Sequence, residues 1–173
     1  MTGSRPTIRV EDAASPGALD QVRELLRGFA AEFDPLVAEV FVVQGFAAEV
    51  AGLPGRYAPP GGSLLLARDG DIPAGCVALR DLGEGTCEMK RLYVPPAYRS
   101  RGAGRLLVAA ILRRAGEMGY RRMVLDTLPA MTAAIALYED FGFSTTAPYW
   151  GHPTAHAVFM ERALGPEAPT PTR

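Results

Sequence analysis

The stretch from Val94 to Leu107 most constrains the fold of this chain, because its pattern is typical of a strand end, a turn without bulk and the start of an amphipathic helix. Such a turn points several backbone N–H groups into the positive end of the helix dipole, a combination that binds phosphate or diphosphate. Gly102 and Gly104 let the main chain approach the anion without a Cβ. Three arginines add charge-assisted donors around it, namely Arg99, Arg101 and Arg105. The stretch predicts binding of a diphosphate-bearing cofactor.

The residues that the turn lacks narrow the choice of cofactor. A P-loop would need Gly-Lys-Ser or Gly-Lys-Thr, and neither follows the turn. A dinucleotide fingerprint would need a third glycine where Leu107 stands, which disfavours that motif. Taken alone, the turn is also compatible with an ordinary strand-to-helix connection that carries surface arginines.

The residues on both sides of the turn continue this pattern of strands and helices. The residue pattern predicts a strand over Cys87–Val94, which leads into the turn, and a helix with one apolar face over Gly102–Gly119. Arg122–Thr127 predicts a buried strand. A second helix is expected near Met131–Phe141, with Gly142 as its C-terminal stop.

Two motifs in this region resemble those of the GNAT superfamily of N-acetyltransferases. Arg99-x-x-Gly102-x-Gly104 resembles the acyl-CoA pyrophosphate loop of that family, usually written Arg/Gln-x-x-Gly-x-Gly/Ala. The string from Ala134 to Phe143 resembles the family signature A-x-x-L-Y-x-x-x-G-F. The two motifs stand in the right order and spacing, and the resemblance spans nearly the whole chain.

The resemblance implies a mixed α/β (α+β) fold, in which helices flank a mostly antiparallel sheet that splays open between its fourth and fifth strands. It places the pantetheine arm of acetyl-CoA in that gap, bonded to the backbone of the fourth strand at about Leu92–Val94. The residues expected to bind the cofactor are Leu92, Tyr93, Val94, Arg99, Ser100, Arg101, Gly102, Ala103, Gly104, Arg105 and Tyr138.

The remainder of the chain supplies the other elements of such a fold. Ser15-Pro16 suits the start of a helix that runs to about Phe33, and a second helix is expected near Leu36–Val50. A loop rich in proline and glycine follows over residues 53–62. The further expected strands are Thr7–Val10, Ser63–Arg68, Ala74–Asp81, Phe143–Ala147 and Ala155–Arg162.

Length and composition indicate one globular domain. The chain has 173 residues, 48% of them hydrophobic and 21% charged, which is ordinary for a soluble protein with a substantial core. We expect a flexible N-terminus over residues 1–6, an N-acetyltransferase domain over 7–164 and a disordered tail over 165–173, where proline and threonine alternate.

Charge and cysteine usage argue against several classes of function. A formal net charge of −1 argues against wholesale electrostatic binding of nucleic acid. No secretory signal opens the chain and polar residues interrupt its most apolar stretch, so we expect no membrane span and a cytoplasmic location. Cys76 and Cys87 are expected as small buried hydrophobes, not as a disulfide or a metal pair. His152 and His156 show no spacing of a metal site, and no metal is expected.

Tyr138 is the candidate general acid. Direct attack of an amine on a thioester requires a base for the amine, a donor for the oxyanion and an acid for the departing thiolate. The resemblance places a tyrosine near the sulfur at this point of the chain, and its phenol can donate to the thiolate. The alternative is a packing tyrosine whose ring lines the cofactor slot.

Glu88 is the candidate general base. It precedes Arg99 by 11 positions, the offset at which histone-type members of the family carry their base. In a regular strand Glu88 shares a face with Lys90 and Leu92, while Arg91 and Tyr93 point the other way, although a bulge before Val94 would alter that parity. The alternative is a salt-bridged strand glutamate beside Lys90.

One position departs from the family, and the acceptor side is poorly encoded. Many relatives have asparagine where Met131 stands. The methionine thioether forms only weak hydrogen bonds, so a cofactor contact through that asparagine is in doubt for this chain. Tyr149 and Trp150 suit an aromatic wall of the acceptor site, core packing or a dimer contact equally. Lys90 or Arg91 could pair with a substrate carboxylate.

Three functions from different classes remain open. The favoured one is transfer of acetyl from acetyl-CoA to a small-molecule amine or a protein amino group within a ternary complex. The second is a catalytically impaired module that binds acyl-CoA as a sensor. The third, a dinucleotide-dependent enzyme, is disfavoured by the missing glycine. The resemblance also makes a homodimer an open alternative.

Overall fold

The computed structural model describes residues 8–33, 45–151 and 156–165. The expected flexible start and all but the first residue of the expected tail lie outside these ranges, as does most of the predicted helix over residues 36–50.

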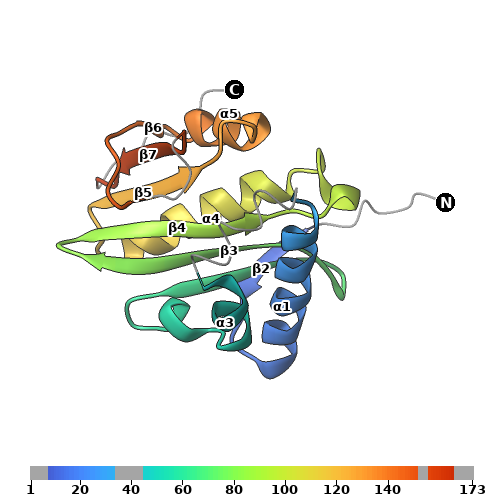
Figure 1. Ribbon diagram of the computed structural model, residues 1–173. Helices are drawn as coiled ribbons and strands as arrows, with labels where there is room; N and C mark the ends of the chain where they lie inside the picture. The colour runs from blue at the N-terminus through green and yellow to red at the C-terminus, as the bar shows by residue number, and fades with distance from the viewer. Residues whose placement is uncertain (1–7, 34–44, 152–155, 166–173) are drawn as a thin grey trace.

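A seven-stranded sheet forms the centre of the fold, with strand order β1-β2-β3-β4-β5-β7-β6 (Figure 1). Neighbouring strands are antiparallel except β4 and β5, which run parallel. This arrangement confirms the predicted mixed α/β fold with a mostly antiparallel sheet. The strands are β1 (Arg9–Asp12), β2 (Ser63–Asp69), β3 (Ile72–Gly83), β4 (Thr86–Tyr93), β5 (Arg122–Thr127), β6 (Ser144–Thr145) and β7 (Val158–Ala163).

Helices cover both faces of the sheet (Figure 1). The helix α1 begins as predicted, because Ser15 accepts a hydrogen bond from the Ala18 N–H at 3.2 Å and Pro16 occupies the first turn. One face carries α1 (Pro16–Ala31) and α3 (Phe46–Ala51), and the other carries α4 (Ala103–Glu117). The helix α5 (Thr132–Asp140) and two short 3-10 turns, η1 (Gly55–Tyr57) and η2 (Pro96–Tyr98), complete the described elements.

Two apolar cores lie on opposite faces of the sheet. The core under α4 contains Leu107, Ile111 and Met123, and the core under α1 contains Val22 and Leu26. Cys87 belongs to the first core and Cys76 to the second, and both thiols are free and buried. The prediction that the cysteines are small buried hydrophobes is confirmed, and the sheet between them prevents a disulfide.

Several strands differ in extent from the prediction, and β7 begins at Val158 instead of Ala155. The strand β1 is displaced toward residue 12, and β3 is longer at both ends than Ala74–Asp81. The strand β6 contains only Ser144–Thr145, shorter than the expected Phe143–Ala147. Phe143 is buried in the α4-side core, and only the N–H of Thr146 continues the pairing, by donating to Phe159 at 2.8 Å. The alternation of buried and exposed side chains that is typical of a regular strand therefore ends within β6, before Pro148.

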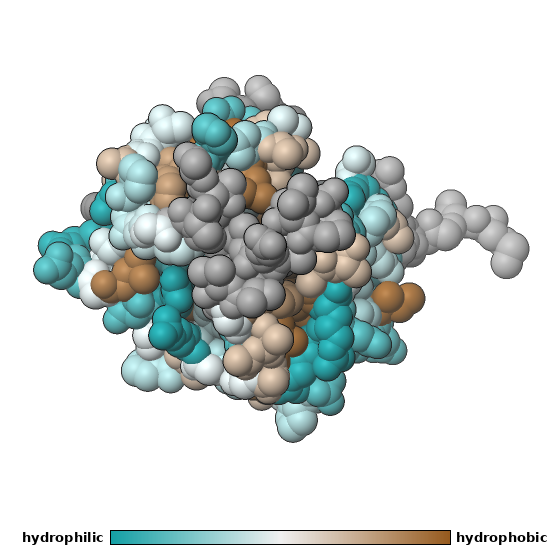
Figure 2. Space-filling view, in the orientation of Figure 1, coloured by the Kyte–Doolittle hydropathy of each residue, from teal (hydrophilic) through white to brown (hydrophobic). Residues whose placement is uncertain are grey.

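Polar and charged residues cover much of the described face that carries α1 and α3, with small apolar patches between them (Figure 2). Among the described helices none is long and apolar enough to cross a bilayer.

The sheet parts between β4 and β5, as the resemblance implies. The two strands pair only at Thr86↔Arg122, Cys87↔Met123 and Glu88↔Val124. On its other edge β4 stays paired with β3 as far as Tyr93↔Cys76. The backbone of β4 beyond Glu88 therefore has no ladder partner on the β5 side.

Candidate active site

A β-bulge reorients the side chains of β4 where the sheet parts. Arg91 has φ 59°, and the pairing with β3 shifts register between Cys76 and Ala78. As a result Leu92 packs with the α4-side core, whereas Tyr93 is buried in the α1-side core. The prediction for a regular strand, with Leu92 on the face of Glu88 and Tyr93 opposite, is therefore wrong, because the extra residue of the bulge inverts the alternation.

The predicted phosphate loop connects the end of β4 to the first turn of α4. Ser100 and Gly102 both adopt left-handed backbone conformations, with φ 59° and 87°. The helix starts at Ala103 without a side-chain cap and without an acidic residue in its first turn. A Cβ on Gly102 would meet nothing within 4 Å. The loop thus presents the uncapped, positive end of a helix dipole beside open space, as an anion site requires.

Gly104 brings three elements together beside this loop. A Cβ at this position would lie 3.3 Å from Leu137 Cδ2 in α5 and 3.8 Å from Val94 Cγ2 at the end of β4. Glycine therefore allows α4 to approach the residue next to Tyr138. Leu137, which precedes the candidate acid in the sequence, therefore packs against the first turn of α4.

The three arginines of the loop are held by carboxylates from other elements. Arg99 donates to the Val94 carbonyl at 3.0 Å and to Glu32, at the end of α1, at 2.5 Å. Arg101 donates to Asp69 at 2.9 Å, and Arg105 to Asp140 at 2.7 Å. All three guanidinium side chains remain 40–50% exposed. They are oriented at the rim of the loop and still accessible to an anion.

Glu32 links the end of α1 to Tyr93 of β4 and to Arg99 of the loop. Its carboxylate accepts hydrogen bonds from the Tyr93 hydroxyl at 2.6 Å and from Arg99. Burial alone would raise the pKa of Glu32, but these hydrogen bonds and the charge of Arg99 outweigh it and lower that pKa. No motif in the sequence marks Glu32 as a partner of this loop.

Tyr138 lies buried in α5 with its ring edge-on to Phe143 at a centroid distance of 5.9 Å. Burial, and secondarily the charge of Asp126, raise the pKa of its phenol well above the ordinary value. The phenol is therefore protonated at neutral pH and able to donate.

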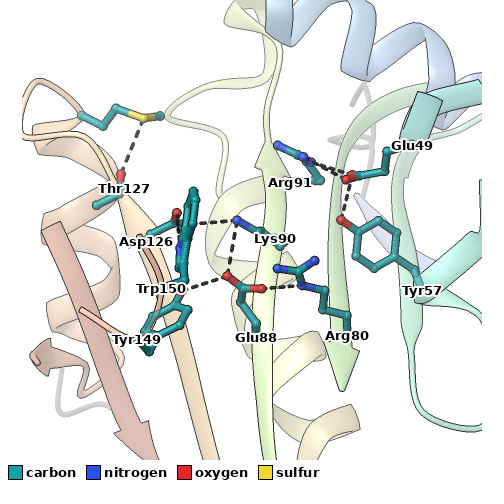
Figure 3. Close-up of polar contacts among 11 residues, drawn as sticks. Glu49, Tyr57, Arg80, Glu88, Lys90, Arg91, Asp126, Thr127, Tyr149 and Trp150 are labelled. Carbon is teal, nitrogen blue, oxygen red and sulfur yellow. Dashed lines mark hydrogen bonds and ion pairs between the residues drawn. The ribbon is translucent and has the colours of Figure 1, made fainter. Parts of the chain in front are cut away.

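A buried charge network crosses the parted strands on the face that carries α1 (Figure 3). Arg80 donates to Glu88 at 2.5 Å, and Lys90 lies 3.3 Å from the other Glu88 oxygen. Lys90 also donates to Asp126 of β5 at 3.0 Å. Glu88 pairs with Val124 in the last rung of the β4–β5 ladder, so Lys90 and Asp126 stand two residues further along each strand. Their ion pair joins the strands beyond the point where backbone pairing ends.

Two aromatic residues of the β6–β7 connection attach to this network. The Tyr149 hydroxyl donates to Glu88 at 2.8 Å, and the Trp150 indole donates to Asp126 at 3.1 Å. Lys90 also lies 5.6 Å from the centre of the Trp150 ring. Both aromatic side chains are thus attached to the charge network that spans β4 and β5. Sequence reasoning missed Asp126 and Arg80, although a single carboxylate in the buried strand Arg122–Thr127 was a signal for the first.

A second cluster holds the bulge of β4 from α3 (Figure 3). Arg91 makes two hydrogen bonds to the Glu49 carboxylate, at 2.7 and 3.0 Å, and the Tyr57 hydroxyl donates to Glu49 at 2.8 Å. Both Arg91 and Lys90 are thus engaged with carboxylates of the protein. A substrate carboxylate would have to displace Glu49 or Asp126 to pair with them.

This cluster makes the stability of the fold dependent on pH. Burial raises the pKa of Glu49, but the hydrogen bonds and charge of Arg91 outweigh it and hold that pKa below 4.5. A carboxyl with a depressed folded-state pKa stabilises the fold above its unfolded pKa, and the contribution is lost as the pH falls through the folded pKa. We expect Glu49→Gln to destabilise the protein by about 1 to 3 kcal/mol at pH 7, and the difference from wild type to shrink below pH 4.

Thermal unfolding between pH 3 and pH 7 tests this expectation. Glu11→Gln is the matched control, because Glu11 forms a more exposed pair with Arg68 and such pairs contribute about 0 to 1 kcal/mol. A constant difference between Glu49→Gln and wild type across this pH range would contradict it.

Met131, which replaces the asparagine found in many relatives, lies at the start of α5. It forms no side-chain cap of the helix. The Thr127 hydroxyl instead lies 3.6 Å from its sulfur, a weak hydrogen bond that joins β5 to the helix.

Comparison with known proteins agrees with this geometry. A family model described as the acetyltransferase (GNAT) family matches residues 23–143. An uncharacterized N-acetyltransferase of Schizosaccharomyces pombe is 39% identical over 155 residues, which cover 88% of this chain and 93% of the relative.

Solved structures share the fold at lower identity. A GNAT-family acetyltransferase from Staphylococcus aureus superimposes with a TM-score of 0.73 at 17% identity, covering 92% of this chain and 100% of the other. The PaiA N-acetyltransferase from Thermoplasma acidophilum, solved in complex with coenzyme A, gives a TM-score of 0.72 at 16% identity over 91% and 99% of the two chains. The match to the family model and the similarity to the yeast relative together show that this chain belongs to the acetyltransferase (GNAT) family.

Proposed function

We propose that this protein is an N-acetyltransferase that transfers acetyl from acetyl-CoA to a primary amine of a small molecule or a protein. The observation that carries the proposal is the uncapped α4 N-terminus at the end of the parted strand β4, with Leu137, the neighbour of Tyr138 in α5, packed against the first turn of α4. Membership of the acetyltransferase family supports it. So does the coenzyme A in the Thermoplasma structure, which shares the fold.

The loop and the unpaired edge of β4 are suited to the two halves of the cofactor. The N–H groups at Gly102–Arg105, with the rim arginines, would hold the diphosphate. The backbone of Leu92–Val94 would bond the amides of the pantetheine arm, as an added strand does at a sheet edge. The thioester would then lie between the parted strands, near Tyr138.

The chemistry follows from these placements. The acceptor nitrogen attacks the acetyl carbonyl, so that a C–N bond forms and the C–S bond breaks, with no covalent enzyme intermediate. Glu88 is the proposed base that accepts the proton of the acceptor, and Tyr138 is the proposed acid that protonates the leaving thiolate.

A second candidate function is an acyl-CoA sensor without catalysis, which Met131 in place of the family's asparagine favours. Both functions require binding of acetyl-CoA, so both predict thermal stabilisation by acetyl-CoA but not by NAD or ATP. Failure of acetyl-CoA to stabilise the protein would contradict both.

Release of free thiol from acetyl-CoA separates the two functions. The assay uses spermidine, glycine, an aminoglycoside and a lysine-containing peptide as acceptors. Release that requires one of these amines supports the enzyme. Binding without release with any of them supports the sensor.

A further inference from the structure

The proposed base Glu88 is shielded from solvent. Its side chain is 0% exposed and contacts Arg80, Lys90 and Tyr149. The two cations offset the cost of burying the carboxylate. If Glu88 receives the proton of an acceptor amine, another group must pass it on.

The chemistry of its three partners decides which group this is. The guanidinium of Arg80 and the ammonium of Lys90 have only N–H donors and no lone pair to accept a proton. The Tyr149 phenol has both an O–H, which already donates to Glu88 at 2.8 Å, and lone pairs on the same oxygen. Tyr149 is also less buried than Glu88. Among these three partners of Glu88, Tyr149 is the one that can accept a proton on one side and deliver one on the other.

We propose, on the basis of the proposed function, that Tyr149 is a catalytic residue that relays the proton of the acceptor amine to Glu88. The ammonium N–H bond of the acceptor breaks as a new O–H bond forms on the phenol. The original phenol proton moves to Glu88 Oε1, which becomes neutral. The amine gains its lone pair, Tyr149 ends as a neutral phenol, and no further reactant is consumed.

The surroundings of Tyr149 suit a relay that must keep one orientation. Its ring packs edge-on against Phe159 at a centroid distance of 5.2 Å. The next residue, Trp150, is anchored to Asp126, so two successive side chains fix the segment to the sheet. Burial, and then the charge of Glu88, raise the pKa of the Tyr149 phenol above its ordinary range. The group therefore keeps its proton between turnovers.

Tyr149→Phe tests the relay because it keeps the ring and removes only the hydroxyl. With the fastest acceptor of the four-amine panel, we expect kcat at pH 7 to fall about 100-fold with an unchanged KM for acetyl-CoA. The deficit should shrink steadily as the pH rises toward the pKa of that amine, because the deprotonated acceptor needs no relay. A purely structural role would lower kcat by the same factor at every pH.

Tyr120→Phe is the matched control. It removes a tyrosine hydroxyl that donates to the Gly61 carbonyl at 2.6 Å, outside the site. We expect its kcat to keep the pH profile of wild type. Rates are expressed per acetyl-CoA site counted by calorimetric titration, so that a partly unfolded variant does not count as an inactive one.

The outcomes distinguish the relay from the function on which it rests. If wild type releases no thiol with any acceptor, the proposed function fails. If wild type is active and Tyr149→Phe keeps its rate and pH profile, the relay is overturned while the function stands. The double variant Tyr149→Phe/Glu88→Gln should be no slower than the slower single variant, and additive losses would also overturn the relay.

Discussion

Tyr138→Phe is expected to lower kcat by about 10- to 1000-fold, the range typical of acid–base groups, with little change in the affinity for acetyl-CoA. The ring would remain packed against Phe143, and only the hydroxyl that we propose as the acid for the leaving thiolate would be lost. The phenol is held protonated by burial, so the wild-type enzyme should keep this acid through the whole neutral range of pH. Steady-state kinetics and calorimetric titration with acetyl-CoA measure the two quantities separately.

Tyr120→Phe provides the comparison for this variant. Tyr120 donates to the Gly61 carbonyl at 2.6 Å, so its replacement removes a hydroxyl and one hydrogen bond outside the site. We expect a loss of about 0.5 to 1.5 kcal/mol in stability and an unchanged kcat. Near-normal turnover in Tyr138→Phe would eliminate the acid role and leave Tyr138 as a packing residue.

Gly62→Ala is expected to cause the largest loss of stability. A Cβ at Gly62 would lie 2.5 Å from three backbone atoms, which belong to Arg56 and Tyr57. Main chain cannot rotate away as a side chain can, so we expect a loss of about 3 kcal/mol. For a chain of this size that loss corresponds to a fall in Tm of about 6 to 12 °C.

The effect should also reach the site, because Tyr57 bonds Glu49 and Glu49 holds Arg91 at the bulge of β4. Gly17→Ala is the control, since a Cβ there meets nothing within 4 Å in α1, and alanine is about 1 kcal/mol better than glycine inside a helix. Equal melting temperatures for the two variants would mean that the backbone at Gly62 relaxes freely.

The elements with local signals were predictable from the sequence. Ser15 and Pro16 predicted the start of α1, and the loop pattern predicted a helix from Gly102, one residue before α4 begins. The parting of the sheet followed from the family motifs, because nothing local in β4 or β5 indicates it. Both strands have ordinary strand composition, and their separation depends on how the rest of the fold holds them apart.

The charge network was not predictable in the same way. Glu88 and Lys90 were recognised from their positions in β4, but their partners Arg80, Asp126 and Tyr149 come from three other segments. The bulge at Arg91 was foreseen only as an alternative. A bulge depends on the register of the neighbouring strand, here β3, and register is a property of the pair.

Where the strands part, the main-chain N–H and C=O groups of β4 on the side of β5 form a sheet edge that is not paired with a neighbouring strand. Most proteins cover or shorten such an edge, because it can pair with another chain. Here the edge faces β5 of the same sheet. If the amide groups of the proposed acetyl-CoA pair with it, the ligand completes the sheet, and the folded population should rise with the concentration of acetyl-CoA through mass action.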